Sequence, residues 1–221
     1  MNAVHGMKYI LDEAMGTRER REREKARRRE HILKTARKLF WSKGFDGTTM
    51  PEIAGAAELA PGTLYLYFRS KEALYVELLK EGYEVLLARL REAVREEAPP
   101  RRQAEALMDA FVRFAGEFPD YFDIIFFVIQ SEGRGLHELS SERQLMSELE
   151  AHEDACKEIA RRVLRALQPK ARAADVARRV EAVWSMLAGV VLYFHRDGPE
   201  AFGQVAEEAK RILLRGALAV E

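Results

Sequence analysis

Hydroxyl-bearing residues and a glycine are concentrated in one short stretch, where they are suited to contacts with phosphate groups. Gly62 and Thr63 are followed closely by Tyr65 and Tyr67. Tyrosine and threonine hydroxyls donate hydrogen bonds to phosphate oxygens, and glycine lets the backbone approach closely. Lys71 adds a positive charge just beyond them. The alternative is that both tyrosines are ordinary core aromatics of an amphipathic helix.

Motifs of enzymatic chemistry are not found in the sequence. It has no glycine-rich phosphate loop after a strand, no G-x-S-x-G and no H-E-x-x-H. His152 and Cys156 lie four residues apart on one helix face, so they could hold a metal, line a cavity or belong to the core. Two ligands do not make a metal site, and no further cysteine exists. We therefore expect no enzyme, no metal and no cofactor.

Two short helices on a tight turn must position the phosphate-binding groups. Thr49 is a suitable N-cap for the first helix, and Glu52 completes a capping box. Pro61 is suited to the first position of the second helix. Leu64 and Phe68 are four residues apart, so they share the face that would anchor this second helix. Helices this short need a third helix to pack against.

The segment before these helices supplies the third one. An apolar stripe predicts a helix over 30–43, and Gly44 is a natural stop for it. Ahead of it, 18–29 holds eight basic and three acidic side chains. This run is either a solvated extension of the helix with i,i+4 ion pairs, or an arm along the DNA backbone or minor groove, and both can hold. We expect 1–25 to be a mobile basic arm.

The sequence GTLYLYFRSKEAL, preceded by TTMPEIA, resembles the helix-turn-helix of the tetracycline-repressor (TetR/AcrR) family. HILKTARKLFWSKGFDGTT resembles that family's first helix and glycine-containing turn, so the resemblance covers 26–86. Two positions depart from the common pattern, because many members have Gly where Glu58 stands and Ser where Ala60 stands. If the first position needs a positive φ, Glu58 costs of order 1 kcal/mol there. At the second position a helix cap is missing.

The whole chain reads as all-α, because no strand pattern occurs anywhere in it. A fourth helix is predicted from Ser70 to about Glu97, where Pro99 and Pro100 stop it. We expect a helix-turn-helix over 49–68 inside a DNA-binding domain at 26–86, joined by this long helix to a helical ligand-binding and dimerisation domain at 87–221. Further helices are predicted at 104–118, 121–130, 140–167, 174–194 and 202–219, with Gly133 and Gly135 in a loop and Ser140 or Ser141 as a cap.

The charge distribution supports this division. The 221 residues carry no net charge, but 1–71 hold 15 basic and 9 acidic side chains, a net charge of +6, and 72–221 carry −6. A basic N-terminal part joined to an acidic remainder is typical of a protein with one end for DNA. No signal peptide or membrane-spanning run is apparent, and the single cysteine fits a reducing cytoplasm, where we expect the protein to be located.

Large apolar and aromatic side chains are abundant in the C-terminal part. They are first of all core material, but the resemblance implies a small-molecule pocket among these helices. We expect a hydrophobic or aromatic ligand in a largely apolar pocket with few polar anchors. The candidate ligand-binding residues are Phe111, Phe126, Gln130, His152, Cys156, Trp184 and Tyr193.

The resemblance implies a homodimeric DNA-binding transcriptional regulator that pairs through its last two helices, where Ala182, Ser185, Ala188 and Gly189 permit close approach. It would be a repressor, released from a palindromic operator by its ligand, without a membrane partner. Two alternatives stay open: a helical ligand-binding or enzymatic protein whose helix-turn-helix no longer functions, and a DNA-binding dimer without a ligand. The candidate DNA-binding residues are Thr49, Pro61, Gly62, Thr63, Tyr65, Tyr67 and Lys71.

Overall fold

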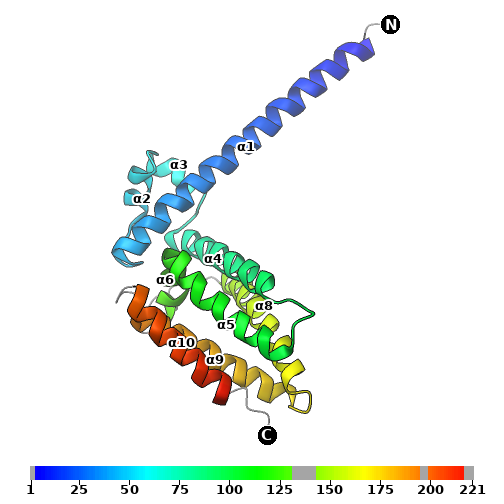
Figure 1. Ribbon diagram of the computed structural model, residues 1–221. Coiled ribbons are helices and arrows are strands. Elements are labelled where there is room, and N and C mark those ends of the chain that lie inside the picture. Colours follow the sequence, from blue (N-terminus) through cyan, green and yellow to red (C-terminus); the bar gives the residue numbers. More distant parts are fainter. Residues whose placement is uncertain (1–2, 131–142, 195–198, 217–221) are drawn as a thin grey trace. The chain divides into compact units, whose positions relative to one another are not determined.

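A computed structural model describes residues 3–130, 143–194 and 199–216, and within these ranges every regular element is a helix, which confirms the all-α prediction (Figure 1). The chain forms two compact units, Met1–Leu74 and Tyr75–Glu221. The described helices are α1 (Ala3–Lys43), α2 (Met50–Ala56), α3 (Pro61–Tyr65), α4 (Lys71–Ala93), α5 (Pro100–Glu117), α6 (Pro119–Gln130), α8 (Arg143–Leu167), α9 (Ala173–Phe194) and α10 (Pro199–Gly216).

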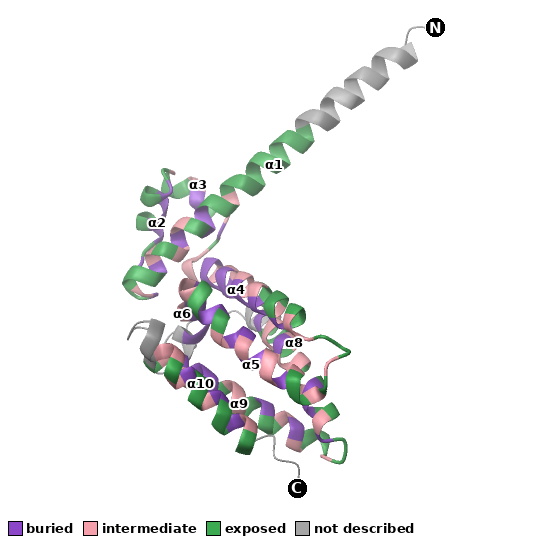
Figure 2. Cartoon of the chain, viewed as in Figure 1, coloured by how far each residue is buried: buried purple, intermediate pink, exposed green. Residues whose placement is uncertain are grey.

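The N-terminal unit is built on the second half of α1. Ile32, Leu33 and Ala36 are almost fully buried there, at helical spacing, and α2 packs against both α1 and α3. Leu64 and Phe68 are also buried, as the sequence predicts. Figure 2 shows the same helix exposed over its charged segment, 18–28, before it enters the core.

Local side-chain bonds fix where the short helices begin. Thr49 caps α2: its hydroxyl accepts from the backbone N–H of Glu52 at 3.4 Å, and the Glu52 carboxylate accepts from the Thr49 N–H at 2.9 Å. The predicted capping box is therefore confirmed. Ser70 caps α4 by accepting from the Ala73 N–H at 3.1 Å. Ala60 makes no side-chain cap bond at the start of α3.

The C-terminal unit is a bundle with an aromatic centre. α5 packs against α6, α8, α9 and α10, and its Phe111 contacts the rings of Phe122, Phe126 and Trp184. The Tyr75 hydroxyl on α4 donates to the carbonyl oxygen of Ile124 on α6 at 2.7 Å. Burial raises the pKa of Tyr75 far above its ordinary value, so the hydroxyl stays protonated and keeps this bond.

Several helix boundaries differ from the prediction. The first helix begins at Ala3 instead of residue 30, because the charged segment continues the helix without a break. The mobility expected for 1–25 stays a prediction. α4 ends at Ala93, before the predicted Glu97, and turns toward Pro99 and Pro100. A proline suits the first turn of a helix, so α5 and α10 begin at Pro100 and Pro199, earlier than predicted. The features predicted at Gly133, Gly135, Ser140 and Ser141 lie outside the described residues.

In the parts of the chain that the structure describes, no helix combines the length and the apolar composition needed to cross a bilayer.

Candidate nucleic-acid interface and ligand cavity

The turn between α2 and α3 holds a residue in a left-handed conformation. Glu58 has φ of 56°, in the region that favours glycine. The turn is closed by the Leu59 N–H, which donates to the carbonyl oxygen of Ala54 at 2.8 Å. Glu58 thus stands where a positive φ is required, and the helix-turn-helix forms in spite of that cost.

α3 presents an uncharged surface to the outside of its unit. Leu64 and Phe68 anchor the helix in the core, whereas Pro61, Gly62 and Tyr65 are exposed. Apart from its chain neighbours and the backbone of its own helix, a Cβ atom added at Gly62 would meet no atom within 4 Å. Internal packing therefore does not require glycine here, and the space in front of it is open to an external partner.

Thr63 and Tyr67 are half-buried beside this surface. Two exposed neighbours were missed by the sequence analysis, Leu66 and Arg69. Leu66 is 82% exposed at the end of α3. It lies outside the Leu64–Phe68 stripe, and this helical phase is the signal that could have identified it. An exposed leucine on such a helix can contact the methyl group of thymine.

Two of the predicted phosphate-binding residues also have bonds within the fold. The Lys71 ammonium donates to the carbonyl oxygen of Phe45 at 2.9 Å and lies 4.1 Å from the centroid of the Phe45 ring. The Thr49 hydroxyl donates to the Glu52 carboxylate at 3.0 Å. An ammonium has three hydrogens, so Lys71 still has donors for a phosphate, whereas the Thr49 hydroxyl proton is already used.

The carboxylate of Glu52, at the start of α2, forms an ion pair with a lysine. Lys43 at the end of α1 lies 2.9 Å from the Glu52 carboxylate. The hydrogen bond from Lys43, with those from Thr49, lowers the pKa of Glu52. Glu52 therefore stays ionised, and Lys43 offsets a negative charge that would otherwise repel a phosphate at this helix end.

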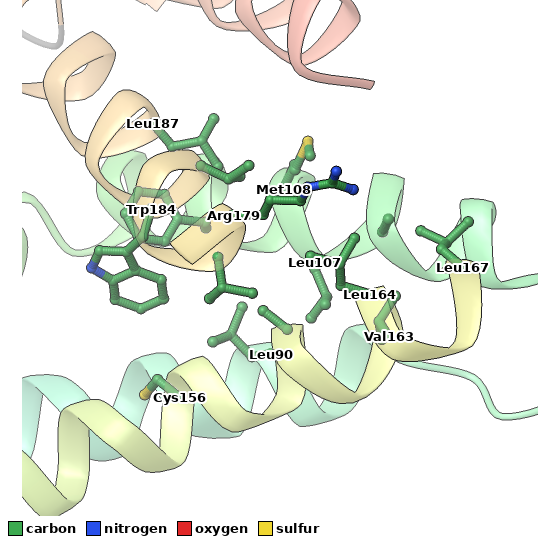
Figure 3. A pocket seen from close by; sticks show the side chains of 15 residues that line it. Leu90, Leu107, Met108, Cys156, Val163, Leu164, Leu167, Arg179, Trp184 and Leu187 are labelled. Atoms are coloured by element: carbon green, nitrogen blue, oxygen red, sulfur yellow. The ribbon is translucent and has the colours of Figure 1, made fainter. Parts of the chain in front are cut away.

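The C-terminal unit contains an apolar cavity of about 70 Å³ (Figure 3). α5, α8 and α9 provide most of its wall, together with Leu90 of α4. Arg179 is the single charged residue among those that line it. Its guanidinium donates to the side-chain oxygen of Gln168, which is buried. In Figure 3 this guanidinium points away from the indole of Trp184.

Three of the seven predicted ligand-binding residues line this cavity: Phe111, Cys156 and Trp184. The Cys156 thiol is fully buried, and its sulfur lies 3.7 Å from the carbonyl oxygen of Tyr83, to which it donates. Burial, with a smaller contribution from Glu153, raises the pKa of Cys156 to about 12. The thiol is therefore protonated at neutral pH and acts as a small apolar group.

The other predicted residues do not line it. Phe126 is buried against Phe111 and Phe122. His152 lies near Glu148, with Nδ1 2.7 Å from its carbonyl oxygen. Tyr193 is 81% exposed, because it lies two residues beyond the buried Val191 and so points to the opposite side of α9. The side chain of Gln130 lies outside the described residues.

No group of three or more histidine, cysteine or acidic side chains suited to a metal occurs within the described ranges. In particular, the pair His152 and Cys156 gains no third ligand there. The two residues have the carbonyl neighbours given above instead.

One face of α9 exposes small and apolar residues together. Ala182, Ser185, Met186 and Tyr193 are exposed, with Met186 at 54%, and Gly189 between them is half-buried. These positions are three or four residues apart, so they share a face. Ala188, which the sequence analysis grouped with them, is buried on the other side of the helix. On the adjacent α10, Ile212 is 59% exposed.

Two protein-family models match the chain. The model described as bacterial regulatory proteins, tetR family, matches residues 32–78. The model described as tetracyclin repressor-like, C-terminal domain, matches residues 104–215. Together they include α2, α3 and all the residues that line the cavity except Leu90.

Curated relatives resemble the N-terminal part. The HTH-type transcriptional repressor NemR of Escherichia coli (strain K12) is 42% identical over 64 residues, which are 29% of this chain and 32% of NemR. The HTH-type transcriptional regulator UidR of the same organism is 41% identical over 66 residues, which are 30% of this chain and 34% of UidR. The chain thus spans about a third of the length of these two relatives.

Solved structures resemble most of the chain. The TetR family transcriptional regulator PfmR from Thermus thermophilus is 32% identical with a TM-score of 0.67, and the match covers 84% of this chain and 97% of PfmR. The ketosteroid transcriptional regulator KstR2 of Mycobacterium tuberculosis is 25% identical with a TM-score of 0.65, covering 86% of this chain and 94% of KstR2.

Proposed function

Because this chain belongs to the TetR family of bacterial regulatory proteins, we propose that it binds palindromic operator DNA as a homodimer and represses transcription. A small, largely apolar ligand releases it from the DNA. The observation that carries the DNA-binding part is the exposed, uncharged surface of α3, where Gly62 has open space in front of it and Tyr65 is exposed. Such a helix can enter a major groove while hydroxyl groups and nearby basic side chains contact the phosphates.

The roles follow from the position of each side chain. Pro61, Gly62 and Thr63 at the N-terminal end of α3 approach the base edges. Tyr65, Tyr67 and Lys71 contact the DNA backbone. A phosphate accepts hydrogen bonds, and both the hydroxyl and the backbone N–H of Thr49 donate to the Glu52 carboxylate. Thr49 therefore contacts a phosphate only if one of these bonds to Glu52 is exchanged. One helix of five residues gives little specificity, so two-fold symmetry on a palindromic site is needed.

The test of operator binding is a footprint of the purified protein on the DNA upstream of its own gene, at near-physiological salt. The expected result is a protected, roughly palindromic site with half-sites about one helical turn or more apart. Binding sequences selected from random DNA extend the test to operators elsewhere. If the protein binds specifically neither to the upstream DNA nor to any selected sequence, the proposal of a transcriptional regulator is rejected. A helical ligand-binding protein is then favoured.

The exposed face of α9 supports the homodimer. A second copy placed against Met186, Gly189 and Tyr193 covers apolar surface, and small residues let the two helices approach closely. Met186→Glu in the centre of the face places two like charges at the symmetric contact. We expect it to give a monomer in sedimentation velocity, whereas Ala166→Glu, exposed on α8 and outside the last two helices, keeps the dimer. A dimer that persists in both variants would exclude this interface.

The cavity supports the ligand part of the proposal. Its wall is apolar except for Arg179, so a hydrophobic or aromatic molecule is the class that fits. A volume of about 70 Å³ is smaller than the roughly 150 Å³ of a dry cavity that admits benzene. A ligand must therefore displace side chains of α5, α8 or α9. It shifts the protein away from DNA only if it binds the displaced form better.

The same small volume favours a second candidate, a DNA-binding dimer with a solid core and no ligand. A thermal-shift screen with apolar compounds, including fatty acids and steroids, separates the two candidates. Compounds that raise the melting temperature and also release the operator support the ligand. Stabilisation by none of them would favour the dimer without a ligand.

A further inference from the structure

A line of basic side chains continues the buried face of α1 beyond the folded domain. The buried residues Ile32 and Ala36 lie seven residues after Lys25 and Arg29, and seven residues are close to two helical turns. Arg21 and Arg18 continue the same face toward the N-terminus, at spacings of four and three residues. We refer to Arg18, Arg21, Lys25 and Arg29 as the basic stripe.

The basic stripe begins where α1 leaves the core. Arg29 is half-buried, and its guanidinium carbon lies 5.2 Å from the centroid of the Phe68 ring. Every residue from 18 to 28 is exposed. Phe68 follows the end of α3 at Tyr65 by three residues, so the stripe starts beside the C-terminal end of the proposed recognition helix. Figure 1 shows α1 running on past α3.

Most of the charges on this face are not neutralised by the residues that the structure describes. Across the segment 18–28, the ion pairs are Glu19 with Arg23 and Glu24 with Arg28, and neither includes a stripe residue. Like charges three or four residues apart on a helix repel each other. An external anion would relieve that repulsion among Arg18, Arg21 and Lys25.

The composition of the segment 18–29 indicates which kind of anionic partner it can bind. Around the helix, Ala26 is the single apolar residue between 18 and 29, so no apolar face exists that could enter a membrane interface or a coiled coil. Arg29 follows Arg18 by eleven positions, which is ~16 Å along the helix at its rise per residue. That length corresponds to about five base pairs of B-DNA at roughly 3.4 Å each.

We propose that the basic stripe is a second DNA-binding surface, which contacts phosphates outside the operator half-site that α3 reads. Arg18, Arg21 and Lys25 contribute affinity by releasing counterions and do not read the base sequence. The operator bound by the whole chain is then longer than the base pairs that α3 specifies. This inference rests on the proposed function, because it requires α3 to place the chain on its operator.

The test compares two duplexes by fluorescence anisotropy, one limited to the palindromic base pairs that define the two half-sites and one with six further base pairs at each end. Arg21→Gln with Lys25→Gln removes two stripe charges. Arg20→Gln with Arg27→Gln is the matched control, because these arginines are exposed on the opposite side of the same helix and neither ion pair of the segment includes them. Circular dichroism verifies that the helix content of both variants is unchanged.

For the wild-type chain and the control variant, we expect the long duplex to bind at least tenfold more tightly than the short one at 0.15 M salt. In the stripe variant this ratio falls toward one, while affinity for the short duplex is kept. The slope of log affinity against log salt on the long duplex falls by about 0.9 for each lost phosphate contact, or by up to about four for a dimer.

Three results would overturn the proposal that the basic stripe binds DNA. The wild-type chain could bind both duplexes equally, or the two double variants could lose the same affinity, which indicates only a general charge effect. In these two cases operator binding by α3 still stands. If the wild-type chain binds neither duplex specifically, the proposed function itself fails and the stripe inference fails with it.

Discussion

The ammonium of Lys71 joins the first residue of α4 to the turn after α1: it donates to the carbonyl oxygen of Phe45 at 2.9 Å and lies 4.1 Å from that residue's ring centroid. The Phe45 ring in turn stacks on Phe40 of α1, with centroids 5.8 Å apart. Lys71, which we predict to contact DNA, thus also holds the start of α4 against the turn after α1. Experiments can separate these two roles.

Replacing Lys71 by Met keeps the aliphatic stem and removes the charge and the hydrogen bond. We expect the N-terminal unit to lose about 2 kcal/mol of unfolding free energy, because a buried carbonyl loses a charged donor and the ring loses its cation. Urea unfolding followed by the fluorescence of Trp41, in a Trp184→Phe background, measures this loss. Lys38→Met, which removes an exposed charge from α1, is the control and stays within about 0.5 kcal/mol.

The same pair of variants tests the phosphate contact. If Lys71 uses its remaining hydrogens for a phosphate, Lys71→Met weakens binding to all DNA sequences alike and lowers the salt slope by about 0.9 per subunit. A reduced stability with an unchanged salt slope would make Lys71 a purely structural residue.

Gly62 offers a prediction in which stability and DNA binding change in opposite directions. A Cβ atom at Gly62 or at Gly55 meets nothing within 4 Å beyond its chain neighbours and the backbone of its own helix. Either substitution by Ala should therefore stabilise its helix by up to about 1 kcal/mol. Gly62→Ala places a methyl group on the α3 surface that we propose approaches the bases, so we expect at least tenfold weaker operator binding. Gly55→Ala on α2 should retain full affinity in the same anisotropy assay.

Glu58 is a site where the family resemblance predicts a gain in stability. Its φ of 56° strains a residue with a Cβ atom. Glu58→Gly should raise the free energy of unfolding of the N-terminal unit by about 1 kcal/mol, and Glu58→Ala should give no comparable gain because it retains the Cβ atom. Urea midpoints of the three proteins decide this. Equal midpoints for Gly and Ala would show that the strain costs nothing measurable.

Features set by neighbouring residues could be predicted from the sequence. The capping box of Thr49 and Glu52 and the positive φ at Glu58 depend on local geometry, which residue types and the family pattern reveal. The partner of Lys71 could not be predicted, because Phe45 lies 26 residues away and the contact depends on how the domain closes. The prediction at Tyr193 is wrong for another reason: aromatic character alone does not place a side chain in a cavity, and the helical phase of Tyr193 relative to the buried Val191 points outward.

The helical phase of apolar residues also explains why three of the residues that line the cavity could be predicted. Phe111, Cys156 and Trp184 lie on the apolar stripes of three different helices, and stripes must converge in a bundle. Which stripe residues leave space between them depends on the fit of side chains from α5, α8 and α9. A single sequence does not specify that fit, so Phe126 could not be distinguished from its neighbour Phe111 in advance.

Cys156 provides a test of how closed the cavity is. Its raised pKa of about 12 means that the folded protein keeps the thiol protonated at pH 8, so alkylation by iodoacetamide should be on the order of 1,000-fold slower than in urea. As pH rises from about 9 toward 12, the unfolded chain releases this proton first, so the thiol's contribution to stability is lost across that window. Rapid alkylation of the folded protein would mean that the cavity opens frequently.

Filling the cavity should uncouple ligand response from DNA binding. Ala160 on α8 lines the cavity, and Ala160→Phe places a ring in the space of about 70 Å³. We expect this variant to bind the operator with wild-type affinity and to lose both the thermal shift and the operator release caused by any compound found in the screen. Overpacking costs about 1–3 kcal/mol, so its melting temperature serves as a check that the fold is retained.

The matched control for Ala160→Phe is Ala166→Phe, on the same helix but exposed to solvent. It adds the same ring outside the cavity and should retain the full ligand response. If Ala160→Phe responds like the wild-type chain, the ligand binds elsewhere, and the apolar cavity among α5, α8 and α9 is packing space only.

If both variants lose DNA binding, the bundle tolerates no added volume. A smaller substitution, Ala160→Val, then repeats the comparison with less strain, and a graded loss of ligand response from Val to Phe would still locate the ligand in this cavity.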